Sequence, residues 1–141
     1  MGISERMSRI RSKDTGPEFV VRRLLYGMGY RYRLHVRKLP GSPDIVFHGR
    51  KKAIFVNGCF WHQHQGCKVA HIPKSNREFW QAKLDRNRKR DMANQDALRD
   101  LGWDVLVIWE CEVGDSLALA ARLLNHLGPH KESLSLAGAR L

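Results

Sequence analysis

The sequence lacks the features of a secreted or membrane-spanning protein. It has no hydrophobic run long enough to cross a bilayer and no apolar signal region in residues 1–6. Acidic residues are also scarce: 14 stand against 25 lysines and arginines, which gives a formal net charge of +11. Without a basic amphipathic helix for an anionic membrane, this charge favours a nucleic-acid partner and a cytoplasmic, nucleoid-associated protein. The alternative is a basic surface that only keeps the protein in solution.

Cysteine is equally scarce, with three residues in 141. An odd number in a chain that we expect to be cytoplasmic argues against a disulfide framework and favours metal ligands or free thiols. Two of the cysteines lie in residues 58–67, GCFWHQHQGC, beside two imidazoles and two large aromatic side chains. The third, Cys111, follows an apolar run near the end of the chain. The segment 58–67 is therefore the first candidate for a functional site.

The chain is long enough for one domain with a single core, which we expect at residues 14–128. Residues 1–13 contain four basic side chains with little periodicity, as in a flexible basic arm that grips DNA or in a plain frayed terminus. Residues 129–141 are expected to form a C-terminal tail.

Short apolar or alternating runs predict four strands, at 29–35, 45–47, 53–56 and 105–109. A tight basic turn joins the second and third into a hairpin. Helical spacing predicts three helices, at 17–27, 75–101 and 117–127. The long helix would begin at a Ser75-x-x-Glu78 capping box and present an apolar face that includes Phe79 and Leu101. This order predicts an α/β fold in which helices flank a central mixed β-sheet.

Four metal ligands can meet if the last strand ends beside the segment 58–67: Cys59, His64, Cys67 and Cys111. Structural zinc prefers such a closed tetrahedral set of thiolates and imidazole. We therefore expect a structural zinc site with no open coordination position. His62 or His71 is an alternative nitrogen ligand, and three reduced cysteines in the core are the alternative without metal.

Asp44 stands at the mouth of the first buried strand. A carboxylate there is costly to bury unless it is paired or binds a cation. The hairpin would bring it close to Val56 and His62, which suits Mg²⁺-assisted hydrolysis with His62 taking a proton from the attacking water. An ordinary turn residue is the alternative. Glu18 could add a water-mediated contact to the cation or merely complement its helix N-terminus.

Phe60 and Trp61 are adjacent aromatic residues beside glycine. Buried, they would be ordinary core; exposed on a basic protein, they would be wedges or stacking platforms for bases. Stacking contributes roughly 1–3 kcal/mol per base, enough to offset the cost of unstacking one step. Trp80 could join them or pack inward beside Phe79.

Several strings resemble the very-short-patch repair (Vsr) DNA mismatch endonucleases, in order along the chain: Pro43-Asp44, Ile54-Phe55-Val56-Asn57-Gly58-Cys59-Phe60-Trp61-His62, Glu78-Phe79-Trp80, Arg90-Asp91, Leu101-Gly102-Trp103 and Trp109-Glu110-Cys111. The likeness runs from about residue 4 to about residue 112, and GCFWH with a downstream WEC is its most specific part. It implies a restriction-endonuclease-like fold, catalytic Mg²⁺ and structural zinc. It also implies that one strand is nicked beside a T:G mismatch, the product of 5-methylcytosine deamination. We expect a monomer acting on mismatched double-stranded DNA, with the need for other mismatch-repair proteins left open.

By position, the resemblance assigns Mg²⁺ binding to Asp44 with the backbone carbonyl of Val56, activation of water to His62, and support of the hydrated cation to Glu18. It assigns zinc binding to Cys59, His64, Cys67 and Cys111. It assigns opening of the duplex to Phe60, Trp61 and Trp80.

The sequence departs from the family pattern at Val56-Asn57, where a family member has Thr-His, and in a gap between His64 and Cys67 that is one residue longer. Two further hypotheses remain beside the mismatch endonuclease. One is a sequence-specific nicking enzyme of the same fold without mismatch preference. The other is a zinc-stabilised DNA-binding module without catalysis.

Overall fold

The computed structural model describes residues 15–67 and 70–128 as three helices and a four-stranded sheet. The helices are α2 (Gly16–Gly27), α3 (Arg77–Asp100) and α4 (Ser116–Leu127). The strands are β1 (Arg33–Leu34), β2 (Ile45–Phe47), β3 (Lys52–Asn57) and β4 (Asp104–Trp109). The predicted arm at 1–13 and tail at 129–141 lie outside the described residues.

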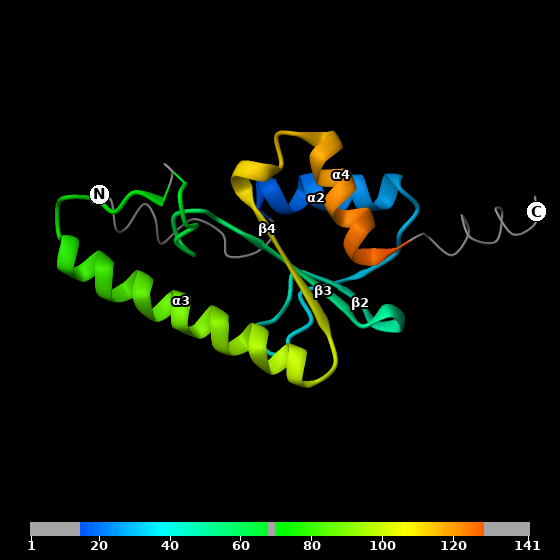
Figure 1. Ribbon diagram of the computed structural model, residues 1–141, viewed down its shortest axis with the longest axis horizontal. Coiled ribbons are helices and arrows are strands. Elements are labelled where there is room, and N and C mark those ends of the chain that lie inside the picture. Colours follow the sequence, from blue (N-terminus) through cyan, green and yellow to red (C-terminus); the bar gives the residue numbers. More distant parts are fainter. Residues whose placement is uncertain (1–14, 68–69, 129–141) are drawn as a thin grey trace, which may run out of the picture.

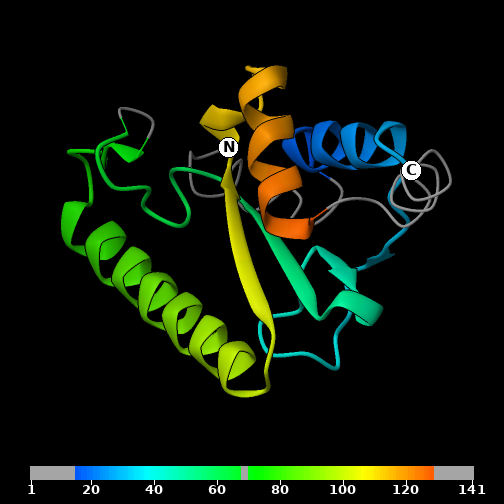
Figure 2. The same ribbon diagram turned by 45° about the vertical axis from the view of Figure 1, so that its right-hand side comes forward.

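The sheet separates two layers of helices. In Figures 1 and 2, α2 and α4 lie on one face and α3 lies along the other. Strands follow one another in the order β1-β2-β3-β4, with β2 antiparallel to its neighbours and β3 parallel to β4. The predicted mixed α/β architecture is therefore confirmed. None of the described helices combines the length and apolar content that a membrane crossing requires.

The strand directions bring three separate segments to one edge of the sheet. Because β3 and β4 are parallel, with Asn57 opposite Trp109, the segment that follows β3 and the turn that follows β4 leave the sheet side by side. The antiparallel pairing of Ile45 with Ile54 puts the start of β2 at the same edge. Residues near 44, 58–67 and 111 therefore meet in space although they are far apart in sequence.

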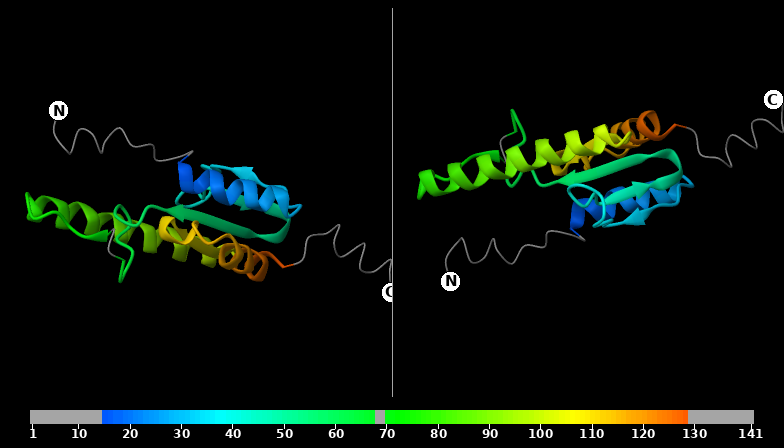
Figure 3. Two further views of the ribbon diagram at one scale, coloured as in Figure 1. Left: turned by 90° about the horizontal axis from the view of Figure 1, so that it is seen from above. Right: turned by 90° about the horizontal axis from the view of Figure 1, so that it is seen from below.

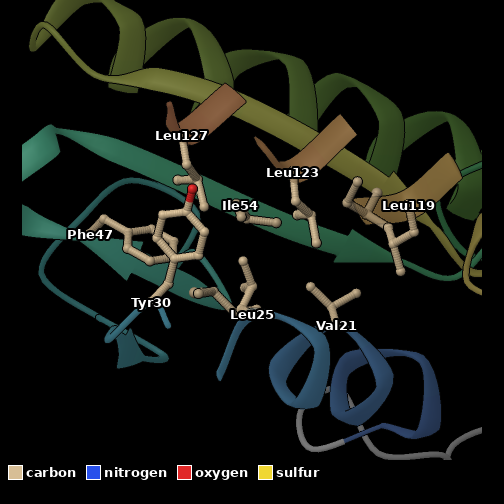
Figure 4. Close-up of a cluster of buried hydrophobic side chains, with 10 residues drawn as sticks. Val21, Leu25, Tyr30, Phe47, Ile54, Leu119, Leu123 and Leu127 are labelled. Atoms are coloured by element: carbon tan, nitrogen blue, oxygen red, sulfur yellow. The ribbon is translucent and has the colours of Figure 1, made fainter. Parts of the chain in front are cut away.

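A large apolar core lies between the sheet and the pair α2–α4 (Figure 4). Leucines at positions 119, 123 and 127 recur every four residues and form one face of α4, and Val21 and Leu25 do the same on α2. They pack on the side chains of alternate strand residues, Ile45, Ile54 and Ile108. Burying one such side chain contributes about 1.5–3 kcal/mol, so this layer holds the sheet edge in place.

The opposite face of the sheet carries the intervening strand residues. Val46, Ala53 and Phe55 pack there against Leu98 of α3 and against Trp103, which follows that helix. This alternation is the period of two that a sheet covered on both faces requires. The C-terminal part of α3 is thus fixed to the sheet, whereas its N-terminal part extends past the strands (Figure 3).

Two local predictions for the long helix are wrong. The N-cap of α3 is Asn76, in a left-handed conformation with φ 56° and without a side-chain capping hydrogen bond, so no capping box forms from Ser75. The helix begins beyond that kink, and the expected apolar face is incomplete because Phe79 and Leu101 are 51% and 55% exposed.

The strand expected at 29–35 is reduced to Arg33–Leu34. Its two tyrosines, Tyr30 and Tyr32, pack on the core and lie outside the strand pairing. Tyr30 is buried and donates its hydroxyl to the carbonyl of Gly128, and the Tyr32 hydroxyl donates to the carbonyl of Arg22 at 3.1 Å. The alternation of aromatic residues and arginine therefore reflects two anchored tyrosines.

Candidate functional site

A groove of about 1460 Å³ opens at the edge of the sheet where β3 ends and β2 begins. Its walls come from the start of α2, the loop before β2, the end of β3 with the following turn, and the middle of α3. Polar side chains that line it include Asp44, Asn57, His62, Arg90 and Asp91. Space of this size beside carboxylates and imidazoles makes the groove the candidate active site.

Asp44 enters the groove from the residue before β2. One of its oxygens, Oδ2, accepts the backbone N–H of Val56 at 2.7 Å. Burial raises the pKa of the Asp44 carboxyl, and the Val56 hydrogen bond and the imidazoles of His35 and His62 oppose that rise. The structure therefore brings Asp44 and Val56 together as expected, with His62 near enough to act on the carboxylate. A buried carboxylate next to backbone is a donor set of hard oxygens, which fits Mg²⁺.

His62 lies in the turn after β3 and contacts α3. Its Nδ1 is 2.5 Å from Oδ2 of Asp91. A carboxylate at Nδ1 fixes the ring so that Nδ1 carries the proton, which leaves the lone pair on Nε2 for a proton acceptor role. Sequence analysis gave Asp91 no role. Its signal was its presence in the Arg90-Asp91 string, but no local pattern shows that α3 passes beside His62.

Glu18 lies in the first turn of α2 and is 1% exposed. Its carboxylate forms an ion pair with Arg22, one helical turn later, and its Oε2 is 3.1 Å from His35 Nε2. The other ring nitrogen of His35, Nδ1, faces Asp44 Oδ1 at 3.9 Å. Glu18, His35 and Asp44 thus form one polar cluster whose ligand atoms lie within 4.8 Å of one another. Sequence analysis missed His35, because it stood at the end of an expected strand.

A second cluster joins residues of the same turn to Cys111. The ligand atoms of Cys59, His64, Cys67 and Cys111 are within 4.8 Å of one another. His64 Nδ1 is 3.7 Å from Cys59 Sγ and 3.4 Å from Cys111 Sγ. In the described part of the chain the imidazole that joins the thiols is thus His64, while His62 turns to Asp91.

The surroundings of these thiols favour a bound cation. Burial raises the pKa of the Cys59 thiol to about 12, so the thiolate needs a positive partner. The His64 ring stacks on Trp109 at 4.2 Å between centroids, and the backbone N–H of Cys59 donates to Glu110 at 2.9 Å. Three sulfurs and one nitrogen, held in this way, fit the tetrahedral shell of structural zinc.

Three aromatic rings meet where the turn crosses α3. Phe60 and Trp61 are partly exposed and line the groove, with 5.2 Å between their ring centroids in an edge-to-face contact. Trp80 is 4% exposed and lies 5.6 Å from Phe60 and 6.0 Å from Trp61. Trp80 therefore packs inward and supports the two rings that face the groove.

The loop that leads to Asp44 rests directly on α3. At Gly41 φ is +76°, and a Cβ there would lie 2.9 Å from the Cβ of Asn94 and 3.2 Å from the ring of Phe55. Real Cβ atoms do not approach side chains so closely, so only glycine lets the two walls of the groove touch here.

Comparison with known proteins relates the chain to DNA endonucleases. The family model described as DNA mismatch endonuclease Vsr matches residues 3–68. The type II nicking enzyme V.XorIIP of Xanthomonas oryzae pv. oryzae is 51% identical over 123 residues, 87% of this chain and 90% of that protein. The type II nicking enzyme V.NmeAIP of Neisseria meningitidis serogroup A is 43% identical, covering 86% of this chain and 85% of that protein. The DNA mismatch endonuclease Vsr of Escherichia coli K12 is 40% identical, covering 77% and 69%.

Proposed function

The chain belongs to the Vsr family of DNA endonucleases, and we propose that it nicks one strand of duplex DNA next to a T:G mismatch to start very-short-patch repair. The observation that carries the proposal is one groove holding Asp44, His62 and Asp91 beside the partly exposed rings of Phe60 and Trp61. The proposal includes a restriction-endonuclease-like fold, a single endonuclease domain at residues 14–128, and a monomer acting in the cytoplasm.

In the proposed reaction, His62 and Asp91 act as a pair. Asp91 holds Nδ1, so Nε2 takes a proton from the water that attacks the phosphorus atom, and the carboxylate stabilises the imidazolium that results. The P–O bond to the leaving oxygen then breaks, which cuts one strand. Asp44 and the backbone carbonyl of Val56 would hold Mg²⁺, with Glu18 as a more distant support. A bound Mg²⁺ would neutralise charge that develops on the phosphate.

Phe60 and Trp61 are proposed to enter the duplex beside the mismatch, with the buried Trp80 behind them. A wobble pair stacks less well than a Watson–Crick pair, so opening the duplex costs least there. Exposed basic residues of α3 would contact phosphates on either side: Arg86, Arg88, Lys89 and Arg90. Such contacts set the affinity and carry no sequence information, so Phe60 and Trp61 are the residues proposed to favour a mismatch.

Structural zinc is proposed for the cluster of Cys59, His64, Cys67 and Cys111. All four ligands come from the protein, so the ion would have no open position for substrate. Its proposed role is to tie the turn after β3 to the end of β4, and thereby to hold His62 and the aromatic pair where the groove needs them.

A nicking enzyme without mismatch preference is the second candidate. The observation that favours it is that two relatives, 51% and 43% identical, are named type II nicking enzymes. A DNA-binding module without catalysis is disfavoured, because it would have no use for the partly buried carboxylate of Asp44, whose raised pKa shows that its ionised form is disfavoured.

The test is nicking of labelled duplexes that differ at one position, T:G, C:G or T:A, with Mg²⁺ and with EDTA. Denaturing gels with each strand labelled in turn report which strand is cut. We expect the T:G duplex to be nicked in one strand, much faster than the matched duplexes, and only with Mg²⁺. Equal rates on all three duplexes would support the second candidate, and no cutting of any duplex would refute both endonuclease proposals.

A further inference from the structure

We propose that His35 is a positioning residue that links the buried Glu18–Arg22 ion pair to Asp44 and so raises the affinity of the groove for its divalent cation. The inference rests on the proposed function, in which Asp44 holds that cation. It adds a residue to which neither the sequence motifs nor the comparisons give a role.

The His35 ring lies between the two groups that it links. Its Nε2 is 2.9 Å from the Arg22 guanidinium and 3.1 Å from Glu18 Oε2. Its Nδ1 faces Asp44 Oδ1 at 3.9 Å. The side chain is 21% exposed and lines the groove. The imidazole is therefore in contact with the interior of the domain on one side and with the reactive carboxylate on the other.

Nε2 of His35 faces two groups of opposite kind: the Arg22 guanidinium, which only donates, and the Glu18 carboxylate, which only accepts. The imidazole is therefore held against the ion pair through Nε2, and its Nδ1 is directed at Asp44. Because Asp44 Oδ2 already accepts the Val56 N–H, Oδ1 is the oxygen left for a cation, and it is the oxygen that Nδ1 faces.

The backbone of His35 supplies an independent observation. Its φ is +49°, in the left-handed region that non-glycine residues occupy only at a cost in free energy. In this conformation its N–H donates to the carbonyl of Asp44 at 3.1 Å. His35 thus touches both the main chain and the carboxylate of Asp44. Strain retained beside a reactive group is typical of residues that fix its geometry.

The experiment separates the side chain from the backbone. His35→Gly removes the imidazole and favours the left-handed conformation, so the backbone hydrogen bond to Asp44 is preserved. His35→Asn also tolerates that conformation and keeps a polar group near the place of Nδ1. His48→Ala is the matched control, because it removes an imidazole that packs on Trp103 away from the groove.

The readout is Mn²⁺ binding to zinc-loaded protein without DNA, followed by electron paramagnetic resonance. Removing an outer partner of a metal ligand typically lowers metal affinity about 10–100-fold. We expect a loss in that range for His35→Gly, partial recovery for His35→Asn and no change for His48→Ala. Glu18→Gln should weaken binding as well, and combined with His35→Gly it should add little, because both act through one chain of contacts.

Two results would overturn the inference. If His35→Gly binds Mn²⁺ as tightly as the wild type, the imidazole does not position Asp44. If pulsed measurements show directly bound histidine nitrogen that disappears in His35→Gly, His35 is a ligand and not a positioning residue. Failure of the proposed function has a different outcome: the wild type would then nick no duplex, or Asp44→Asn would bind Mn²⁺ unchanged.

Discussion

The cluster of Cys59, His64, Cys67 and Cys111 and the groove differ in their ligand atoms and in their openness, although one turn contributes to both. The cluster has three sulfurs and one nitrogen from four residues that close around a point, at the end of two parallel strands. The groove has carboxylates and imidazoles that face open space of about 1460 Å³. His64 belongs to the first and His62, two residues earlier, to the second. The turn after β3 therefore contributes to both regions within three residues, one region proposed to be structural and the other catalytic.

Both regions bury a group whose ionised form is disfavoured. Burial raises the pKa of Cys59 to about 12 and also raises the pKa of Asp44. In the cluster, a metal held by four protein ligands would turn that cost into stability. In the groove, the Asp44 carboxylate is proposed to keep one oxygen for a cation, so the cost of burying it remains in the protein without that cation. The expected consequence is that changes in the cluster alter stability, whereas changes in the groove alter activity.

The largest expected effect is on activity. Asp44→Ala should lower the nicking rate at least about 1000-fold, since the carboxylate proposed to hold the cation is lost. Zinc content and melting temperature should not fall. Asp104→Ala is the control, because it removes an exposed carboxylate of β4 that pairs with Lys52. A variant at Asp44 that still nicks like the wild type would show that the groove is not the active site.

Next in size is the effect of the cluster on stability. Cys67→Ser should abolish zinc binding and lower the free energy of unfolding by more than about 3 kcal/mol, a modest part of the roughly 10–16 kcal/mol that zinc supplies in small domains. Metal analysis and thermal melts measure both quantities, with about one zinc per chain expected in the wild type. Unchanged stability after zinc removal would contradict the expectation that the cluster, unlike the groove, contributes mainly to stability.

Asp91→Asn should lower kcat about 100-fold, because the amide no longer fixes the His62 tautomer or stabilises the imidazolium. DNA affinity should be unchanged, since neither residue is proposed to hold the duplex. Asp96→Asn, an exposed position of the same helix whose side chain is 71% exposed, controls for the loss of a carboxylate from α3. Equal kcat for the two variants would remove the pair from the mechanism.

Trp61→Ala should weaken binding to mismatched duplex by roughly 1–3 kcal/mol, the value of one stacked base. Binding to matched duplex should change less, so the ratio of the two affinities should fall. Phe79→Ala is the matched control, since Phe79 contacts Trp80 but is not among the residues that line the groove. Fluorescence anisotropy with both duplexes measures the ratio, and an unchanged ratio would assign mismatch preference to another part of the surface.

The smallest effect is on stability and depends on pH. In EDTA, Asp44→Asn should melt slightly above the wild type at pH 7, because the raised pKa of the Asp44 carboxyl means that ionisation is less favourable in the folded state than in the unfolded state. A raised carboxyl pKa contributes stability below the unfolded value and loses it as pH rises. The difference should therefore disappear as pH falls below the ordinary value of 3.8. A difference that grows toward low pH would have the wrong sign.

Chemistry that depends on unusual residue types could be predicted from the sequence. With only three cysteines in the chain, a chance cluster of all three is improbable, so their common site could be predicted. Cys111 meets Cys59 because each follows one of two adjacent parallel strands. The positions of two strands were equally predictable, because residues 45–47 and 105–109 are apolar runs. Only the first is fully buried, since β4 is the edge strand of the sheet and Ile108 is its one buried residue. The position of Asp44 beside Val56 followed from the hairpin.

Contacts made across the fold could not be predicted. Asp91 is one of several charged residues on α3, and only the path of that helix brings it to His62. His35 looked like the end of a strand, since a left-handed backbone at a histidine has no local sequence signal. The missing capping box has the same cause, because Ser75 and Glu78 match the pattern while Asn76 takes the left-handed conformation. Local patterns report propensity, and these residues are set by tertiary contacts.

Gly41 has a consequence for how such a site can change. An added methyl group there would separate the loop that carries Asp44 from the helix that carries Asp91, because it has no free volume between Asn94 and Phe55. Proton transfer and metal binding depend on distances to within about 0.5 Å. The distance between Asp44 and Asp91 therefore depends on the absence of a side chain at Gly41. We expect substitutions at the rim of the groove to be tolerated, whereas a larger residue at position 41 would move its two walls apart.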